Sequence, residues 1–371
     1  MIKKRGKATY QVIIERGRDE SGHRKRQFLT VRGTKKDAEK AERDALVAIE
    51  RGTAVDASKL TLADALETWM REHVRVSLRV STARRYQSMV TRISGEPLGR
   101  MKLQAVRPLA VQAFYTHLLD EEHLNPRTVR HYGVLLHGAF RWAQRLQLVA
   151  VNPTDGATAP RVQPHEVKAL NPEEISRLVE SMAAGDLRNL TLVTVATGLR
   201  ISEALALRWS DYQDEQLRVE RAVSWHPGEG FVFQRPKTRA GNRAIRLGSS
   251  TIEVLRTHRA AQLERRLSLG RVWQDRDLIF PGEFGEIWSP NRVTKQFTAA
   301  AKAAGFLGFT FHGLRHTSAT LMLRGGIDVK LAASRLGHAN TAVTSMVYQH
   351  VQPDLEQRVA EVMDRLLAAT N

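Results

Sequence analysis

The chain has 371 residues, a formal net charge of +18 and no cysteine. This length predicts two or three domains, and the missing cysteines exclude disulfides, thiol catalysis and cysteine-based zinc fingers. The excess charge predicts a polyanionic partner, unless it only keeps the protein in solution. Nucleic acid is favoured over an anionic membrane because the sequence has no long apolar or lipid-anchoring segment. The basic N-terminus also lacks the apolar core of a signal peptide, so we expect a cytoplasmic protein.

Residues 1–55 predict a small, basic module of strands and one helix. Residues 10–15 and 25–31 have the composition of strands, and the turn between them contains Asp19, Ser21 and Gly22. A helix is predicted to begin at Thr34, since Asp37 stands three residues later, close to a capping box. Three consecutive basic residues are candidates for phosphate or base-edge contacts, or else form a solvated strand face: Arg24, Lys25 and Arg26.

Residues 60–151 predict a bundle of four or five helices with one positively charged face. Apolar residues recur there at helical spacing, and turns are expected at 94–97 and at 125–126. Basic residues on the polar sides of these helices suit DNA, although a solubilising role is a strong alternative for any one of them. The candidates for DNA contact are Arg84, Arg85, Arg127 and Arg130.

Residues 152–168 predict an interdomain linker, because they combine three prolines with small polar residues and show no apolar periodicity. From 169 to 371 the mixture of helical and strand patterns is that of a compact α+β domain. An apolar helix over 190–196 ends at Gly198, and Arg200 stands at the start of the next helix. Glu203, one helical turn after Arg200, is placed to hold its guanidinium.

Three segments of this last domain alternate as strands of a small antiparallel sheet. They are residues 217–223, 230–233 and 243–247, and a turn at 236–241 joins the second to the third. Lys237 lies in this turn, where a lysine is most often simply solvated. After residue 350, an amphipathic helix over 353–369 is predicted to pack on its own domain or on a neighbouring protomer.

The stretch 311–350 concentrates cationic and hydrogen-bonding side chains on helical patterns. It holds His312, Arg315, His316, His338 and Tyr348. Arginine clamps phosphate oxygens, imidazole moves protons and a phenol can attack phosphorus, so the set suits phosphodiester chemistry. His312 and His316 have the spacing of metal ligands, but glycine occupies position 313, where a zinc protease has glutamate. We therefore predict neither a metal nor a cofactor.

The ordered motifs ATGLRISE, HGLRH and LGH, followed by Tyr348 ten residues later, resemble the tyrosine recombinases, also called the phage integrase family. The resemblance covers nearly the whole chain. It implies a multidomain, mainly α fold: an arm-type DNA-binding module (1–55) with a small sheet and a helix, a helical core-binding domain (60–151), and an α+β catalytic domain (169–371) with a small antiparallel sheet. It also implies that Lys237 is the general acid.

In such an enzyme Tyr348 is the nucleophile, Arg200 and Arg315 bind the phosphate, His312 is the favoured base and His338 donates a hydrogen bond. The resemblance implies cutting and rejoining through a 3′-phosphotyrosyl bond, with chemistry like that of type IB topoisomerases. The implied partners are double-stranded DNA with core and arm attachment sites, three further protomers in a homotetramer, and DNA-bending or directionality factors. An integrase of a phage or mobile element is favoured; the alternatives are a chromosome-dimer resolvase and a DNA-binding regulator with an inactive catalytic domain.

Overall fold

The computed structural model describes residues 1–18, 24–50, 58–163, 168–226, 228–235, 239–338 and 340. The chain divides into two compact units, Met1–Pro164 and His165–Asn371. None of the helices in the described ranges combines the length and the hydrophobicity that a bilayer-spanning segment needs. The predicted turn at 19–22 and the predicted C-terminal helix at 353–369 lie outside the described residues.

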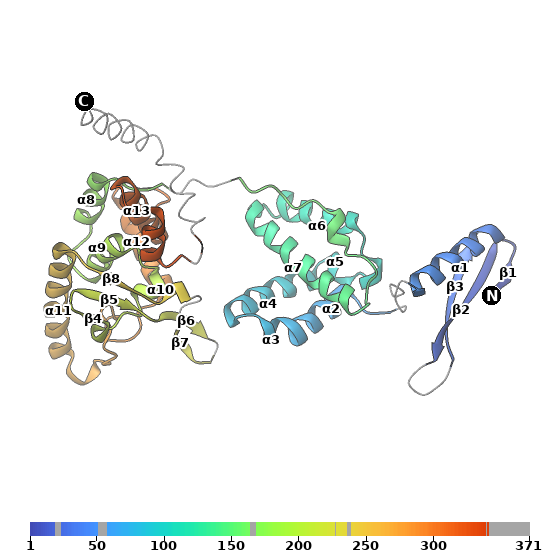
Figure 1. Ribbon diagram of the computed structural model, residues 1–371, viewed down its shortest axis with the longest axis horizontal. Helices are drawn as coiled ribbons and strands as arrows, with labels where there is room; N and C mark the ends of the chain where they lie inside the picture. The colour runs from blue at the N-terminus through green and yellow to red at the C-terminus, as the bar shows by residue number, and fades with distance from the viewer. Residues whose placement is uncertain are drawn as a thin grey trace, which may run out of the picture. The chain divides into compact units, whose positions relative to one another are not determined.

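The first unit begins with a three-stranded antiparallel sheet covered by one helix. The strands are β1 (Ile2–Gly6), β2 (Thr9–Arg18) and β3 (Arg24–Arg32), in that order, and helix α1 (Lys35–Glu50) packs on β2 and β3 (Figure 1). Val12, Ile14 and Ala38 form a small buried core. The two predicted strands and the helix are present. The sequence analysis missed β1, because its sequence IKKRG has three consecutive basic residues and no apolar alternation.

The helices of the first unit surround a separate and larger apolar core. They are α2 (Leu62–Trp69), the π-helix η1 (Met70–Val74), α3 (Arg75–Ser77), α4 (Val80–Gly95), α5 (Pro97–Arg100), the 3-10 turn η2 (Leu103–Ala105), α6 (Pro108–Asp120), α7 (Pro126–Arg145) and the 3-10 turn η3 (Pro153–Gly156). Both predicted turns are present. Asn125 caps α7, where its side chain accepts a hydrogen bond from the backbone N of Arg127 at 2.9 Å, and Pro126 is the first helical residue.

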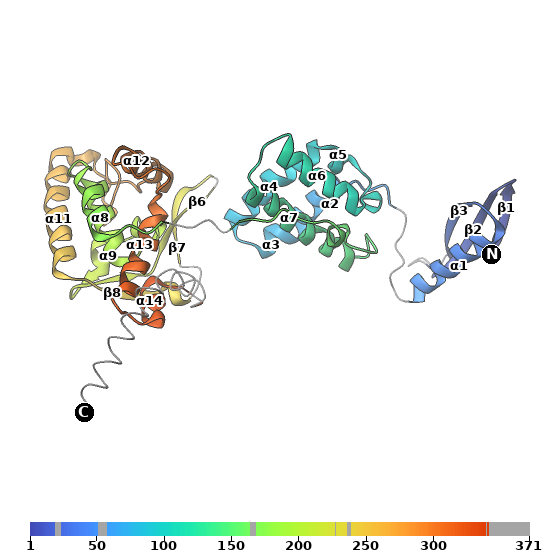
Figure 2. The same ribbon diagram turned by 90° about the horizontal axis from the view of Figure 1, so that it is seen from above.

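The second unit is mainly helical and holds two small sheets. Its elements are α8 (Pro172–Glu180), α9 (Asp186–Thr197), α10 (Ile201–Ala204), η4 (Trp209–Asp211), β4 (Tyr212–Gln213), β5 (Gln216–Val219), β6 (Ala222–His226), β7 (Gly230–Gln234), η5 (Arg239–Gly241), β8 (Arg243–Arg246), α11 (Ser249–Leu269), η6 (Gly270–Val272), α12 (Pro290–Ala303), α13 (Phe311–Arg324) and α14 (Val329–Leu336). Helix α9 packs against both α11 and α13 and is central to this unit (Figures 1 and 2).

In the described part of the second unit, the strands pair antiparallel but form two sheets instead of the one expected. One sheet has the order β4-β5-β8, and the other is the β6-β7 hairpin. The predicted strand 217–223 is divided at residues 220–221, where the Arg221 side chain turns to bond Asp211 at 2.6 Å. Strand β5 therefore pairs directly with β8, and Leu217 opposite Ile245 contributes to the buried core. This pairing brings the start of β8 close to the functional residues described below.

Candidate active site

Two helices of the second unit end on glycines in the left-handed conformation. Gly198 (φ 66°) ends α9, and Gly337 (φ 71°) ends α14. Both helix ends are crowded: a Cβ on Gly198 would overlap Leu336, and one on Gly337 would lie 2.7 Å from Nη1 of Arg243. Because only glycine combines this backbone with so little space, the two helix ends can approach the same group of side chains.

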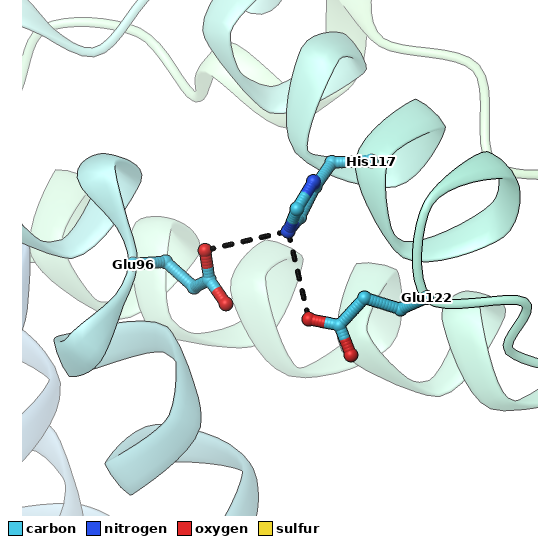
Figure 3. A group of neighbouring side chains, drawn as sticks. All are labelled: Glu96, His117 and Glu122. Carbon is cyan, nitrogen blue, oxygen red and sulfur yellow. Dashed lines mark ion pairs between the residues drawn. The ribbon is translucent and has the colours of Figure 1, made fainter.

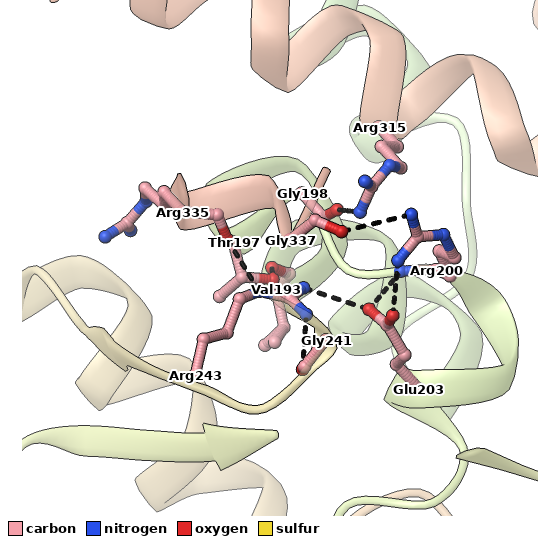
Figure 4. A network of polar contacts seen from close by, with 10 residues as sticks. All are labelled: Val193, Thr197, Gly198, Arg200, Glu203, Gly241, Arg243, Arg315, Arg335 and Gly337. Carbon is pink, nitrogen blue, oxygen red and sulfur yellow. Dashed lines mark hydrogen bonds and ion pairs between the residues drawn. The ribbon is translucent and has the colours of Figure 1, made fainter. Parts of the chain in front are cut away.

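The carbonyls of these two glycines each accept a hydrogen bond from a predicted phosphate-binding arginine. Arg315 donates from Nη1 to Gly198 O at 2.7 Å, and Arg200 donates from Nη2 to Gly337 O at 3.4 Å (Figure 4). The carbonyls that end a helix carry partial negative charge, so they are good acceptors for guanidinium groups. The helix ends thereby bring Arg200 and Arg315, far apart in sequence, into one cluster.

Glu203 holds Arg200 in the way that their spacing predicts. Its Oε1 accepts from Nη1 of Arg200 at 2.6 Å, and its Oε2 accepts from the Arg200 backbone N at 3.1 Å. Only 4% of the Glu203 side chain is exposed. Burial by itself raises the pKa of this carboxyl, but the neighbouring Arg243 and the bonds from Arg200 outweigh it and hold the pKa below its usual range. Glu203 is therefore ionised at neutral pH.

Arg243, at the start of β8, is a member of this cluster that the sequence analysis missed. Its Nη2 donates to the second carboxylate oxygen of Glu203 at 2.9 Å, so Glu203 is shared between two guanidiniums (Figure 4). The only sequence signal was a basic residue at the first position of a predicted strand, and this is common on solvated sheet edges. A charged residue in a strand gives no indication of partners on distant elements.

Arg315 is the most deeply buried cation of the cluster, with 3% of its surface exposed. It projects from α13, and within the described part of the chain its Nη2 has no hydrogen-bond acceptor. Burial, followed by repulsion from Arg200, lowers the pKa of Arg315 to about 9, which still leaves the group charged at neutral pH. A buried guanidinium with an unused donor is costly unless an anion completes it.

Two histidines complete the described part of the cluster. His312 lies in the first turn of α13, and His338 directly follows Gly337. Loss of hydration, followed by the charges of Arg315 and Arg200, lowers the pKa of His312; the same causes lower the pKa of His338 to about 4. Both imidazoles are therefore neutral at pH 7. Neutral imidazole is the form that can take a proton from an attacking group.

The other predicted site residues are only partly described. Tyr348 and Lys237 lie outside the described residues, as do the side chains of Arg24 and Lys25, whose backbone is in β3. Arg26 is exposed and lies 3.6 Å from Glu15. Four candidates for DNA contact are exposed on α4 and at the start of α7: Arg84, Arg85, Arg127 and Arg130. Exposure suits DNA binding and solvation equally, so their role stays a prediction.

A group with the spacing of metal ligands lies in the first unit. Nε2 of His117 is 3.7 Å from Oε2 of Glu96 and 3.5 Å from Oε1 of Glu122 (Figure 3). Arg92 pairs with Glu122, and Glu121 lies 3.1 Å from the other ring nitrogen of His117. These ion pairs connect α4, the start of α5 and the end of α6, and we interpret the group as a structural network.

The cluster in the second unit has the properties of a phosphate-binding site. Among the described residues, Arg200 and Arg243 bond the carboxylate of Glu203, Arg315 lies close enough to feel their charges, and neutral His312 and His338 stand beside them. Three positive charges against one negative charge leave an excess that favours an anion. Planar guanidiniums match the oxygen atoms of a phosphate in geometry as well as in charge.

Comparison with known proteins identifies the family to which this chain belongs. Residues 168–354 match the sequence model of the phage integrase family. The chain therefore belongs to this family, the tyrosine recombinases, which are DNA strand-exchange enzymes. A protein named "Tyrosine recombinase XerC-like" from Caldanaerobacter subterraneus subsp. tengcongensis is 29% identical to it, over 98% of this chain and 97% of that protein.

Solved structures show the same fold. The Tn1549 transposon integrase, in complex with a circular intermediate DNA, has a TM-score of 0.68 at 16% identity, over 81% of this chain and 99% of that chain. A lambda integrase tetramer bound to a Holliday junction has a TM-score of 0.59 at 21% identity, over 93% of this chain and 94% of that one. The expectation of a mainly helical, multidomain recombinase fold is confirmed.

Proposed function

We propose that this tyrosine recombinase is a site-specific integrase of a phage or mobile element, which cuts and rejoins double-stranded DNA through a bond to Tyr348. The observation that carries the proposal is the buried guanidinium of Arg315, which lies with Arg200 around the ends of α9 and α14 and has a donor without an acceptor among the described residues. A scissile phosphate supplies that acceptor. Its oxygens gain negative charge during the reaction, when fixed cations stabilise it most.

In this mechanism the Tyr348 oxygen attacks the phosphorus, and the bond from phosphorus to the 5′ oxygen breaks. His312, neutral at pH 7, takes the proton of the phenol. Lys237 gives a proton to the departing 5′ oxygen, and His338 donates a hydrogen bond to the phosphate. The products are a 3′-phosphotyrosyl ester and a free 5′ hydroxyl, so no atom is gained or lost.

The ester conserves the energy of the original phosphodiester, and the reverse attack by a 5′ hydroxyl rejoins the strand without ATP. Attack by the original hydroxyl gives relaxation, as in type IB topoisomerases, whereas attack by a hydroxyl of a second duplex gives strand exchange. Exchange between two duplexes cuts four strands and needs four copies of Tyr348. We therefore propose a homotetramer on two DNA sites, supported by the lambda integrase tetramer that shares this fold. DNA-bending or directionality factors complete the proposed assembly.

The three-domain division assigns these tasks along the chain. We propose that residues 1–55 bind distal arm sites, that 60–151 bind the core site through the exposed arginines of α4 and α7, and that 169–371 perform the chemistry. The proposed linker 152–168 begins with η3, which packs on α6 and α7. The separate apolar cores of the N-terminal module and of the helical bundle support an independent role for the module.

A chromosome-dimer resolvase is the second candidate, and the XerC-like name of the full-length relative favours it. The arm module distinguishes the two functions. An integrase that lacks residues 1–55 should still form the covalent bond at its core site but lose binding to arm sites. A resolvase has no arm sites, so the deletion would change binding to DNA from the element's ends little.

Trapping the covalent bond tests the proposed function directly. The full chain is incubated with a nicked suicide substrate from the element's own ends in EDTA, and the products are resolved on a denaturing gel. We expect a slow-migrating protein–DNA adduct that is absent for Tyr348→Phe, while the affinity of that variant for DNA stays nearly unchanged. An adduct that persists in Tyr348→Phe would contradict the nucleophile. Tight, salt-sensitive binding without any adduct would indicate a regulator with an inactive catalytic domain.

A further inference from the structure

Arg243 connects three segments of the second unit through one side chain. Its Nη2 donates to Glu203 at 2.9 Å, its Nε to the carbonyl of Arg335 at 2.7 Å, and its Nη1 to the carbonyl of Gly241 at 3.2 Å. All three guanidinium nitrogens are therefore engaged, and 6% of the side chain is exposed. These bonds use three of the five N–H donors of the guanidinium, and the burial of the side chain leaves the other two little access to a DNA phosphate. We therefore expect Arg243 to act on the reaction through the groups that it holds.

Each of the three partners belongs to a segment that carries a proposed catalytic residue. Glu203 also binds Arg200. Gly241 ends η5, four residues after Lys237, and Arg335 lies in the last turn of α14, three residues before His338. The contact to α14 is reciprocal, because the Arg335 side chain donates back to the carbonyl of Arg246 on β8 at 3.2 Å and to that of Ala196 on α9 at 3.2 Å. Strand β8 and helix α14 are thus connected by bonds from both sides, and Figure 4 draws Arg243 and Arg335, the two arginines that make them.

From these contacts we infer that Arg243 is a positioning residue for cleavage, which sets the orientation of Arg200 through Glu203 and the position of His338 through α14. The inference rests on the proposed function. Without Arg243, the Oε2 atom of buried Glu203 loses its strongest partner, and Arg200 is the nearest cation that can compensate. Arg200 would then turn toward Glu203 and away from Gly337 and the phosphate. A small displacement of a phosphate-binding group is enough to cost about 10²-fold in rate.

Two variants on the same strand separate positioning from general stability. Arg243→Met keeps an unbranched apolar stem, although a shorter one, and removes every donor. Arg246→Met is the matched control, because Arg246 is also an arginine of β8 beside a glutamate (Glu215 at 3.4 Å), yet 73% of its side chain is exposed. The measurement is the single-turnover cleavage rate at saturating suicide substrate, together with the dissociation constant for the core site, both on protein shown to be folded.

We expect Arg243→Met to lower the cleavage rate about 10²-fold, with the dissociation constant changed less than about threefold, and Arg246→Met to change either value less than about threefold. Glu203→Gln combined with Arg243→Met should cleave no more slowly than the worse single variant, because the two residues act in one chain of contacts. Wild-type cleavage by folded Arg243→Met would overturn the inference, and so would fully additive effects.

A spectroscopic measurement keeps this inference distinct from the proposed function. In protein labelled with ¹⁵N-arginine, the Nε–Hε resonance of Arg200, assigned with Arg200→Lys, should shift or broaden in Arg243→Met and stay in place in Arg246→Met. If the wild-type protein forms no adduct, the proposed function fails while this signal still reports on positioning. An unchanged Arg200 resonance in Arg243→Met would overturn the positioning role whatever the activity.

Discussion

The protein has two groups of arginines that differ in burial. One group lies on the surface of helices α4 and α7, and the other lies around the ends of α9 and α14. Arg84, Arg85, Arg127 and Arg130 are exposed on the helical bundle. Arg243 and Arg315 are almost wholly buried, and the bonds they make run to carbonyls and to one shared carboxylate. An exposed cationic side chain raises the affinity of the protein for a polyanion almost regardless of the direction in which the side chain points. A buried cationic side chain can bind a phosphate only if its direction is fixed, so its contribution is to position the phosphate.

The largest effect that tests this contrast is expected at Arg315. Arg315→Lys keeps a positive charge but loses the planar fork that binds Gly198 O and leaves Nη2 for the phosphate. We expect single-turnover cleavage to fall about 10²- to 10³-fold, the cost of losing one stabilising donor in a transition state. Measured at saturating DNA, a rate within about threefold of wild type would show that charge alone is sufficient at this buried position.

A smaller effect, of a different kind, is expected on the bundle. Arg84→Ala with Arg85→Ala should weaken core-site binding and lower the slope of log affinity against log salt by about 1 to 2, while cleavage at saturating DNA stays near wild type. Titrations at several salt concentrations measure the slope. Replacing both residues with lysine is the control and should restore most of the affinity, since exposed charges are interchangeable. An unchanged slope would assign these arginines to solvation.

The smallest effect concerns stability and pH. The pKa of His338 lies at about 4 in the folded protein against an ordinary value of 6.5, so the unfolded chain takes up a proton at a pH where the folded chain does not. This contribution to stability is present above pH 6.5 and is lost as the pH falls toward 4. The thermal unfolding midpoint of the wild type should drop more between pH 7 and 5 than that of His338→Gln. The exposed His131→Gln is the control, and equal drops in wild type and His338→Gln would contradict the assignment.

The sequence predicted the parts of this site that depend on local spacing. The spacing predicts Glu203 beside Arg200 because residues three apart are neighbours on a helix surface, and the bond at 2.6 Å has that origin. Gly198 was expected to end its helix, and it does so in the left-handed conformation. The ordered motifs brought in Arg315, His312 and His338 through their resemblance to a family, and the structure gathers these residues with Arg200.

Features set by tertiary pairing were not predictable in this way. Arg243 finds partners 40 and 92 residues away along the chain, and a basic residue at a strand start carries no trace of them. The division into two sheets coincides with the bond from Arg221 to Asp211, at a break in a run that alternates well enough to suggest one strand. In both cases a charged side chain satisfied at a distance overrode the local pattern.

The bonds from Arg315 to Gly198 and from Arg200 to Gly337 also determine at which stage of synthesis and folding the site can form. Arg315 and Gly198 are separated by 117 residues, and Arg200 and Gly337 by 137. Contacts of such long range require long loops to close, and a high share of them slows folding. A chain still on the ribosome exposes Arg200 long before α14 has been synthesised, so it holds a cation without the carbonyl that orients it. We therefore expect cleavage competence only in the completed domain, and no cutting of DNA by unfinished chains.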